Sequence, residues 1–185
     1  MLGTLAGQLS TSDLIGIVAP TNDRESQLYI DGFTSGVKAQ KAQVNVDVSF
    51  VDSYSDPALA AAAAQTTIDG GANVLTGTAA LAAEALNTAG TAESVLWFGN
   101  QADQSPLGQG FVVASQMYHW EVLLQPMLTK VDEGVLGGEL LMADLANNGV
   151  EISYNDSFEL DGSLRDAAQA TAVSLADGSL QTGVE

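Results

Sequence analysis

The stretch Leu14-Ile15-Gly16-Ile17-Val18-Ala19 is a short, continuous run of apolar residues. Such a run is typical of a strand that is buried on both faces, as in a parallel sheet. The segment Pro20-Thr21-Asn22-Asp23 ends the run, and either Asn22 or Asp23 is suited to cap a helix that we expect to extend to about Gln40. A buried strand followed by a capped helix is the building unit of an α/β fold.

The same unit recurs along the chain. Residues 44–50 alternate between apolar and polar, which predicts a strand, and Asp56 followed by Pro57 is a typical helix start. Gly70-Gly71 is a typical helix end. Further strands are expected at residues 72–75, 94–98 and 111–114, and further helices at residues 1–10, 79–89, 117–133 and 164–176. Because parallel neighbours need right-handed crossovers, this alternation predicts a doubly wound parallel sheet.

Residues 138–185 show a less regular pattern. Within them, Glu139–Ala143 and Val150–Tyr154 predict a strand pair joined around Asn147-Asn148-Gly149, which is a typical turn sequence. We expect this part of the chain to lie outside the core sheet.

The composition limits the possible partners. The 185 residues include 23 Asp and Glu against 5 Lys and Arg, which gives a formal net charge of −18, yet 46% of residues are hydrophobic. The chain should therefore fold, and its charge disfavours nucleic acid and anionic membranes as partners. We interpret the acidity as an adaptation to high salt, where the Debye length falls to about 3 Å and self-repulsion is screened.

Other features exclude whole classes of site. There is no cysteine, and hence no disulfide, thiolate metal site or cysteine nucleophile. Dinucleotide and phosphate loops of the GxGxxG and GK[ST] types are absent, so no cofactor is expected. Several carboxylates could in principle hold a hard cation, but no EF-hand spacing occurs and chance proximity explains most pairs in so acidic a chain. These residues are Asp52, Asp56, Asp103, Asp144 and Asp156.

Two polar loops are expected beyond the carboxyl ends of the strands, where such sheets bind ligands. Thr76-Gly77-Thr78 predicts a strand-to-helix turn whose backbone N–H groups meet a ligand, or else a plain helix cap. The loop from Gly99 to Gln104 presents Asn100, Gln101 and Asp103. Their amide and carboxylate groups suit a polar heterocycle or a ribose, and a solvated acidic loop is the alternative.

Tyr118-His119-Trp120 is expected to open the helix at residues 117–133. Aromatic side chains beside a polar loop suit a flat ligand, although one of the three should pack in the core. His119 is the only histidine, and no GxSxG nucleophile motif occurs. An α/β hydrolase that uses His119 with Asp103 or Asp132 is therefore the less favoured alternative.

Eight stretches, in this order and spacing, carry a resemblance to a known family. They are Tyr29-Ile30-Asp31-Gly32-Phe33-Thr34-Ser35-Gly36, Val51-Asp52-Ser53-Tyr54-Ser55-Asp56-Pro57, Asp69-Gly70-Gly71-Ala72-Asn73-Val74, residues 99–104, Val113-Ala114-Ser115-Gln116, Gly137-Gly138-Glu139, Asn148-Gly149-Val150 and residues 164–178. The chain resembles the basic membrane protein (BMP) family, which are lipoproteins and substrate-binding proteins of ABC importers, related to purine-nucleoside receptors. Family members are about twice as long, and only their second half is matched.

The resemblance implies a lobe of the periplasmic-binding-protein type (type I). Residues 1–12 would form a leading helix at the hinge, residues 13–135 the binding lobe, and residues 136–185 the crossover strands and the terminal helix. It implies that the intact protein binds a purine nucleoside or similar small molecule between two lobes, without chemistry, and passes it to an ABC permease. It also implies an extracytoplasmic protein with a lipid anchor, although the first residues of this chain lack the basic region of a signal peptide.

The resemblance also assigns roles to individual residues. Tyr29 would pack on the base, Thr76 and Gly77 would form the turn beside the ligand, and Tyr118 or Trp120 would line the hinge side. The family loop Asp-x-Asp-Gln is Gln101-Ala102-Asp103-Gln104 here, so a neutral Gln101 replaces a carboxylate that would bond a ribose. This change fits a free base or another polar ligand. A stand-alone structural or interaction protein, with its site face covered in a homo-oligomer, is the main alternative.

Overall fold

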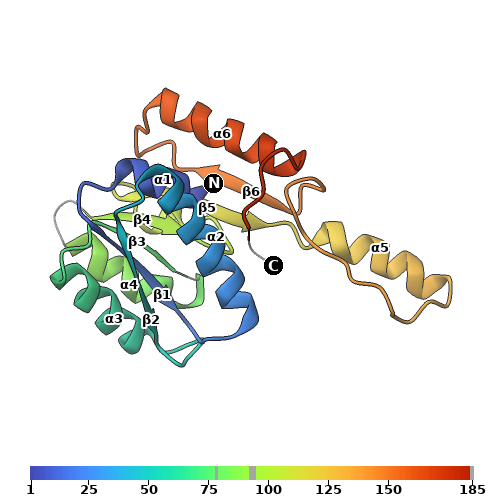
Figure 1. Ribbon diagram of the computed structural model, residues 1–185. Coiled ribbons are helices and arrows are strands. Elements are labelled where there is room, and N and C mark those ends of the chain that lie inside the picture. The colour runs from blue at the N-terminus through green and yellow to red at the C-terminus, as the bar shows by residue number, and fades with distance from the viewer. Residues whose placement is uncertain (78, 92–94, 184–185) are drawn as a thin grey trace.

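The computed structural model describes residues 1–77, 79–91 and 95–183, and it has three layers (Figure 1). A six-stranded sheet, in the order β2-β1-β3-β4-β5-β6, lies between two layers of helices. The strands are β1 (Leu14–Ala19), β2 (Asn45–Phe50), β3 (Val74–Gly77), β4 (Leu96–Gly99), β5 (Val112–Tyr118) and β6 (Val150–Tyr154). The helices are α1 (Leu2–Leu9), α2 (Arg24–Gln40), α3 (Pro57–Asp69), α4 (Ala79–Thr91), α5 (Glu121–Asp132) and α6 (Gly162–Ala176), with a short 3-10 helix η1 (Ser105–Leu107).

The first five strands are parallel and β6 is antiparallel to β5, which confirms the predicted α/β fold with a mostly parallel sheet. Strand β1 pairs on both sides, with β2 and β3. Its side chains alternate between two apolar cores, as a strand buried on both faces requires. Ile15 and Ile17 pack with α1, α2 and α6, whereas Val18 packs with α3 and α4.

Two of the predicted helix starts are confirmed by their caps. The Asp23 carboxylate accepts a hydrogen bond from the backbone N–H of Ser26 at 2.8 Å, and Asp56 accepts from Ala58 N–H at 3.0 Å and Leu59 N–H at 3.2 Å. Asp23 lies in the short loop between β1 and α2, so its cap fixes the first turn of α2 at the carboxyl edge of the sheet.

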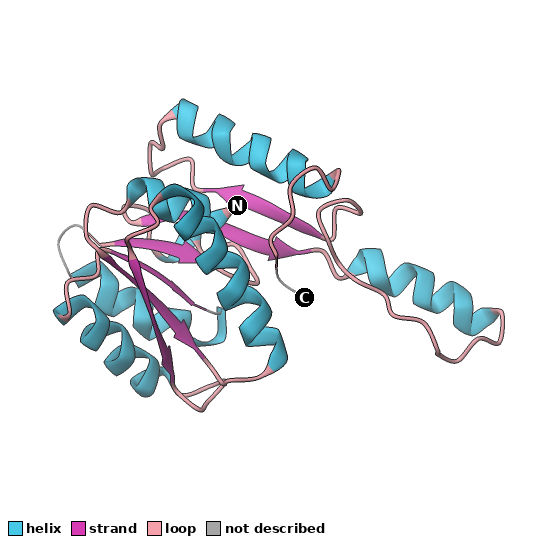
Figure 2. Ribbon diagram, viewed as in Figure 1, coloured by secondary structure: helices cyan, strands magenta, loops and turns pink. Residues whose placement is uncertain are grey.

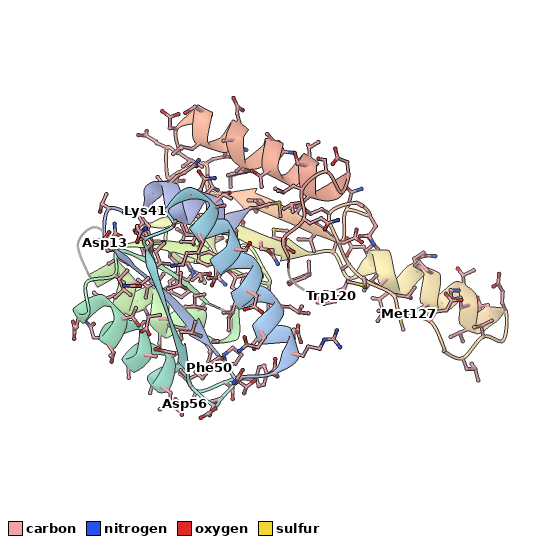
Figure 3. The ribbon with its side chains drawn as sticks, in the orientation of Figure 1. Asp13, Lys41, Phe50, Asp56, Trp120 and Met127 are labelled. Atoms are coloured by element: carbon pink, nitrogen blue, oxygen red, sulfur yellow. The ribbon has the colours of Figure 1, made fainter. Side chains whose placement is uncertain are left out.

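Helices α1 and α2 pack closely because glycines lie at their contact. A Cβ atom added at Gly3 would lie 2.0 Å from the carbonyl oxygen of Phe33, and one at Gly36 would lie 2.9 Å from Thr4 N. Figure 3 labels residues at the two ends of the sheet. Asp13 and Lys41 mark the amino end, where Lys41 Nζ lies 3.9 Å from Asp13 Oδ1, and Phe50 and Asp56 mark the opposite, carboxyl end.

Strand β3 ends later than the sequence predicts. Thr76 pairs with Phe98 and Gly77 pairs with Val18, so both residues lie in the strand and the predicted turn at this position is wrong for them. The third residue of that turn, Thr78, lies outside the described residues, as does Ser94 at the start of the predicted fourth strand. Pairing on both sides of β3 holds this segment extended beyond the apolar run.

Strand β5 also continues past its predicted end, to Tyr118, and α5 begins only at Glu121. Tyr118 is therefore a strand residue and Trp120 is the N-cap of α5, so the prediction that Tyr118 opens a helix is wrong. The reason is β6, which pairs with residues 114–118 and places Tyr118 opposite Val150. A strand formed so far along the chain cannot be anticipated from local propensity.

The predicted strand pair around Asn147 does not form, because Glu139–Ala143 contains no strand. The Asn147 side chain instead closes a local turn, since its amide donates to the Met142 carbonyl at 2.7 Å and its oxygen accepts from Asp144 N–H at 3.0 Å. Strand β6 joins the core sheet beside β5, so the expectation that residues 138–185 lie outside that sheet is also wrong.

Residues 120–142, which we call the arm, project away from the sheet (Figures 1 and 2). No residue of α5 is buried, and the segment after it is tied back to the helix by Lys130 Nζ, 2.6 Å from Glu139 Oε2. The arm exposes Trp120, Leu124, Met127, Leu128, Val131, Val135, Leu136, Leu140 and Met142. Figure 3 labels Trp120 at its base and Met127 farther out. In the described part of the chain, no helix combines the length and apolarity that a bilayer crossing requires.

Candidate functional site

A pocket lies at the carboxyl edge of the sheet, between the first turns of α2 and the ends of β1, β3, β4 and β5. It contains about 490 Å³ of empty space, part of it open to solvent. Its wall is formed by Ile17, Val18, Ala19, Pro20, Asp23, Glu25, Ser26, Tyr29, Ile30, Tyr54, Gly77, Asn100, Gln101 and Tyr118. This is the edge at which open α/β sheets bind ligands.

Tyr29 forms a fixed wall of the pocket. The Thr76 hydroxyl donates to the Phe98 carbonyl at 2.8 Å, so the Tyr29 hydroxyl must be the donor in its 2.6 Å bond to Thr76 Oγ1. The Tyr29 ring also stacks on Phe33, with ring centroids 6.0 Å apart. Burial raises the pKa of the Tyr29 phenol, which therefore stays neutral at ordinary pH.

The floor beside Tyr29 is bare backbone at Gly77. A Cβ atom at this position would lie 2.9 Å from the Val18 carbonyl oxygen and 3.2 Å from the Trp97 ring. A side chain therefore does not fit without movement of the sheet, and the glycine leaves room for a ligand to approach the backbone.

Gln104 holds the loop after β4 in place from behind. Its side-chain oxygen accepts from Trp97 Nε1 at 2.8 Å, its amide donates to the Asn100 carbonyl at 3.1 Å, and its backbone N–H donates to Ser115 Oγ at 3.0 Å. The side chain is 1% exposed. Gln104 thus ties the loop to β4 and β5, and sequence reasoning included it in a polar loop without giving it this role.

Asn100 is the most deeply placed polar side chain of the pocket wall, with 3% of its surface exposed. Its oxygen accepts a hydrogen bond from Gln101 N–H at 2.8 Å, which holds Gln101 in a left-handed conformation with φ of 74°. Among the described residues, no partner accepts a hydrogen bond from the Asn100 amide group. In the described part of the chain, the buried side-chain atoms without a partner are Ser105 Oγ and the Tyr154 hydroxyl, so the Asn100 amide nitrogen is reached by solvent and can donate to a ligand or water.

Tyr118 and Trp120 form a stacked pair at the base of the arm, with ring centroids 5.1 Å apart. Only Tyr118 lines the pocket, where its hydroxyl accepts a hydrogen bond from Gln116 Nε2 at 3.0 Å. Burial raises the pKa of Tyr118. Trp120 is 53% exposed on the arm side.

Sequence reasoning did not assign a ligand-binding role to the polar rim formed by Asp23, Glu25 and Tyr54. The Asp23 carboxylate accepts from Ser26 N–H and from the hydroxyls of Thr21 and Tyr54. These hydrogen bonds hold the pKa of Asp23 well below its usual value, and the bond from the backbone N–H of Ser26 has the largest effect. The position of Asp23 in the short loop that follows a buried strand was the available signal.

The predicted site residues are placed as follows. The pocket wall includes Tyr29, Gly77, Asn100, Gln101 and Tyr118, while Thr76 lies behind Tyr29. Asp103 is exposed and caps the backbone N–H of Ser105 at 3.0 Å, and neither Asp103 nor Trp120 lines the pocket.

His119 contacts two carboxylates that differ from those expected for a hydrolase. Its Nδ1 lies 3.2 Å from Glu121 Oε1 and its Nε2 lies 3.1 Å from Glu151 Oε1. These contacts raise the pKa of His119, and the contact to Glu151 has the larger effect. Within residues 1–77, 79–91 and 95–183, no group of three His, Cys, Asp or Glu side chains is arranged to hold a metal ion.

Comparisons with known proteins agree with this architecture. BmpA of Lactococcus lactis subsp. cremoris, named as an ABC transporter nucleoside-binding protein, is 22% identical over 97% of this chain and 56% of its own length. A solute-binding protein of an ABC transporter system from Aeropyrum pernix K1 has a TM-score of 0.78 at 14% identity, over 97% of this chain and 62% of its own. A transcriptional activator of the comK gene from Bacillus halodurans has a TM-score of 0.81 at 17% identity, over 96% and 61%.

These two structural matches, at such low identity, establish the fold alone. The chain spans little more than half the length of the curated relative that it matches. Residues 1–172 match the Bmp family, described as PnrA-like substrate-binding proteins of ABC transporters. Because this match covers nearly the whole sequence, the chain belongs to the Bmp family.

Proposed function

We propose that this chain is the solute-binding lobe of an ABC importer and that it binds a purine nucleoside or a similar small polar molecule in the pocket described above, without chemistry. The observation that carries the proposal is Asn100, which is 3% exposed and lines the pocket, and whose solvent-accessible amide group donates a hydrogen bond to no described residue. A polar ligand with an acceptor atom would satisfy it.

The rest of the pocket wall supports a flat, polar ligand. The rings of Tyr29, Tyr54 and Tyr118 supply aromatic surface, and Asn100 and Gln101 supply amide groups that donate and accept. The name of the Lactococcus relative supports a nucleoside. Gln101 stands where the family pattern has a carboxylate, which favours a ligand with less dependence on a ribose.

The absence of chemistry in this proposal rests on the site's inventory. The His119 side chain is engaged by Glu121 and Glu151, and among the described residues no histidine lines the pocket. Hydrogen-bond donors, acceptors and rings select and hold a solute, and closure of two lobes around it is the usual device of such proteins.

The arm supports a two-lobed intact protein. Its large apolar side chains are exposed here, and the relatives contain additional chain length that could cover them. We propose that residues 13–135 form the binding lobe, with residues 1–12 and 136–185 at the hinge and crossover. In the intact protein, an extracytoplasmic location with a lipid anchor and an ABC permease as partner complete the proposal.

The test is a titration of this chain in high salt with inosine, adenosine and guanosine, followed by ¹⁵N–¹H NMR. We expect weak binding, in the range of about 1–10 mM, with shifts confined to the pocket residues, because half of the site is missing. Asn100→Asp keeps the acceptor for Gln101 N–H but removes the amide donor, and it should weaken binding about tenfold. Asn87→Asp, an exposed change on α4, is the matched control.

A two-lobed form should bind at least one of these nucleosides at micromolar concentration or tighter. If every purine fails to bind that form, or if shifts in this chain fall outside the pocket, the nucleoside assignment is refuted.

A second candidate role, an interaction protein built on this lobe, is favoured by the same exposed arm. In that case the arm would mediate a homo-oligomer. Size-exclusion chromatography with light scattering in molar salt distinguishes the two roles. The interaction role requires an oligomer, which Leu128→Glu should abolish, whereas the solute-binding role requires no oligomer.

A further inference from the structure

The charged groups on the pocket wall all have the same sign. The wall includes the carboxylates of Asp23 and Glu25, and among the described residues no lysine, arginine or histidine lines it. The three tyrosines are neutral, since the pKa of each is raised. An anionic solute would therefore meet repulsion without a compensating cation.

One usual site for anions is already occupied. The N-terminus of α2 points its first backbone N–H groups to this edge of the sheet, where a phosphate would normally find donors. Here the Asp23 carboxylate takes the Ser26 N–H at 2.8 Å and also accepts from the hydroxyls of Thr21 and Tyr54. The chain's own anion thus stands where a phosphate would bind.

Glu25 differs from Asp23 because no described residue forms a hydrogen bond or ion pair with it. Its side chain is exposed, lines the pocket, and also lines a second hollow that shares Tyr29 and Tyr118 with it. Glu25 lies one turn before Tyr29, so both project from the same face of α2. Its charge acts across the pocket: the pKa of Tyr118 is raised by burial and also by Glu25, and that of Tyr54 by its bond to Asp23 and also by Glu25.

The second, independent observation is Asn100, a residue that is 3% exposed and whose amide group, accessible from the pocket, donates to no described residue. A solute that satisfies both residues has an acceptor for the Asn100 amide and a cationic or donor group for the Glu25 carboxylate. Solutes of nucleoside size that carry an amine together with a ring nitrogen, carbonyl or hydroxyl have both.

We propose that Glu25 is a specificity-determining residue, which makes the pocket select amine-bearing solutes over neutral ones and exclude phosphorylated ones. The inference rests on the proposed solute-binding function and adds the charge class of the solute. Because Glu25 is exposed, the effect is moderate: an exposed pair contributes up to about 1 kcal/mol, which corresponds to about a fivefold change in affinity. It grows as the salt concentration falls.

The test compares three ligands of one shape: adenosine, adenosine 5′-monophosphate, and 5′-amino-5′-deoxyadenosine, which is cationic at neutral pH. Dissociation constants are measured by NMR titration of this chain, at the lowest salt at which circular dichroism shows it folded and again in molar salt. We expect the amine to bind about tenfold tighter than the monophosphate at the lower salt. Glu25→Gln should reduce that ratio at least threefold.

Asp31→Asn is the matched control, since it removes the same charge from an exposed position of α2 that lines neither hollow. An unchanged ratio in Glu25→Gln, or an equal reduction in Asp31→Asn, overturns the role of Glu25 while adenosine binding still supports the proposed function. If none of the three ligands binds the chain, the proposed function fails, and this inference fails with it.

Discussion

Replacement of Gln104 by leucine tests whether the binding loop is held from behind as the structure indicates. The side chain is 1% exposed and connects Trp97 Nε1 at 2.8 Å with the Asn100 carbonyl at 3.1 Å. Leucine has a similar size but neither donor nor acceptor, so Gln104→Leu leaves a buried indole N–H and a backbone carbonyl without partners. Each unsatisfied buried group costs about 1–3 kcal/mol.

The expected loss is therefore about 2–4 kcal/mol in the free energy of unfolding, after a small gain from the apolar side chain. That is a large part of the roughly 5–15 kcal/mol that stabilises a typical domain. Urea unfolding in high salt, followed by tryptophan fluorescence, measures it. The control is Gln109→Leu, the same change at an exposed position of the same loop, which should stay within about 0.5 kcal/mol.

Hydrogen exchange of the Trp97 indole proton gives a second readout, because loss of its acceptor should speed its exchange. If Gln104→Leu costs no more than Gln109→Leu, the loop does not depend on this side chain and the account of how Asn100 is positioned is wrong.

Three further predictions concern helix packing and two titrating groups. Gly32→Ala should raise the free energy of unfolding by about 0.5–1 kcal/mol, because no atom lies near the added Cβ. Gly36→Ala should lower it by about 1–3 kcal/mol, because its Cβ would lie 2.9 Å from the backbone of α1. Shifts of the same sign in the thermal unfolding of the two variants would contradict this account of the helix contact. The pKa of His119, followed by NMR, should lie above its ordinary value of 6.5 and should fall in Glu151→Gln. The contacts of the protonated His119 therefore stabilise the fold below pH 6.5, and this stabilisation is lost as pH rises through the folded-state pKa. The Tyr29 phenol should ionise only above its ordinary pKa of 10.0, so its contribution to the free energy of unfolding is present below pH 10.0 and is lost as pH rises above it. An ultraviolet titration in which Tyr29→Phe removes a phenol that ionises early would refute this.

Local patterns predict the first half of the fold well. The continuous apolar run at residues 14–19, the alternation near residues 44–50, and the caps at Asp23 and Asp56 are each set by neighbours in the sequence. Strand β6 is different, because its partner β5 lies before the arm and the pairing of Tyr118 with Val150 depends on tertiary structure. Its effect on the length of β5 is likewise invisible to a local pattern.

For the candidate site, the sequence indicates the correct edge of the sheet but not which side chains meet there. Asn100, Gln101, Tyr29 and Tyr118 line the pocket because strands β4 and β5 and helix α2 end beside one another. Asp103 follows Asn100 by only three residues, yet it is exposed, and its carboxylate accepts a hydrogen bond from the backbone N–H of Ser105. A polar loop does not reveal which of its residues turn inward.

The arm also has a consequence for how the molecule opens. Residues 119–149 separate the two strands β5 and β6, so closing that long loop costs entropy that adjacent strands would not incur. Strand β6 lies at the edge of the described sheet and pairs there with β5 alone. It should therefore form last and detach first, together with α6, as a cooperative unit of lower stability than the parallel sheet. Native-state hydrogen exchange should show the amides shared by β5 and β6 exchanging before those of β1 and β3.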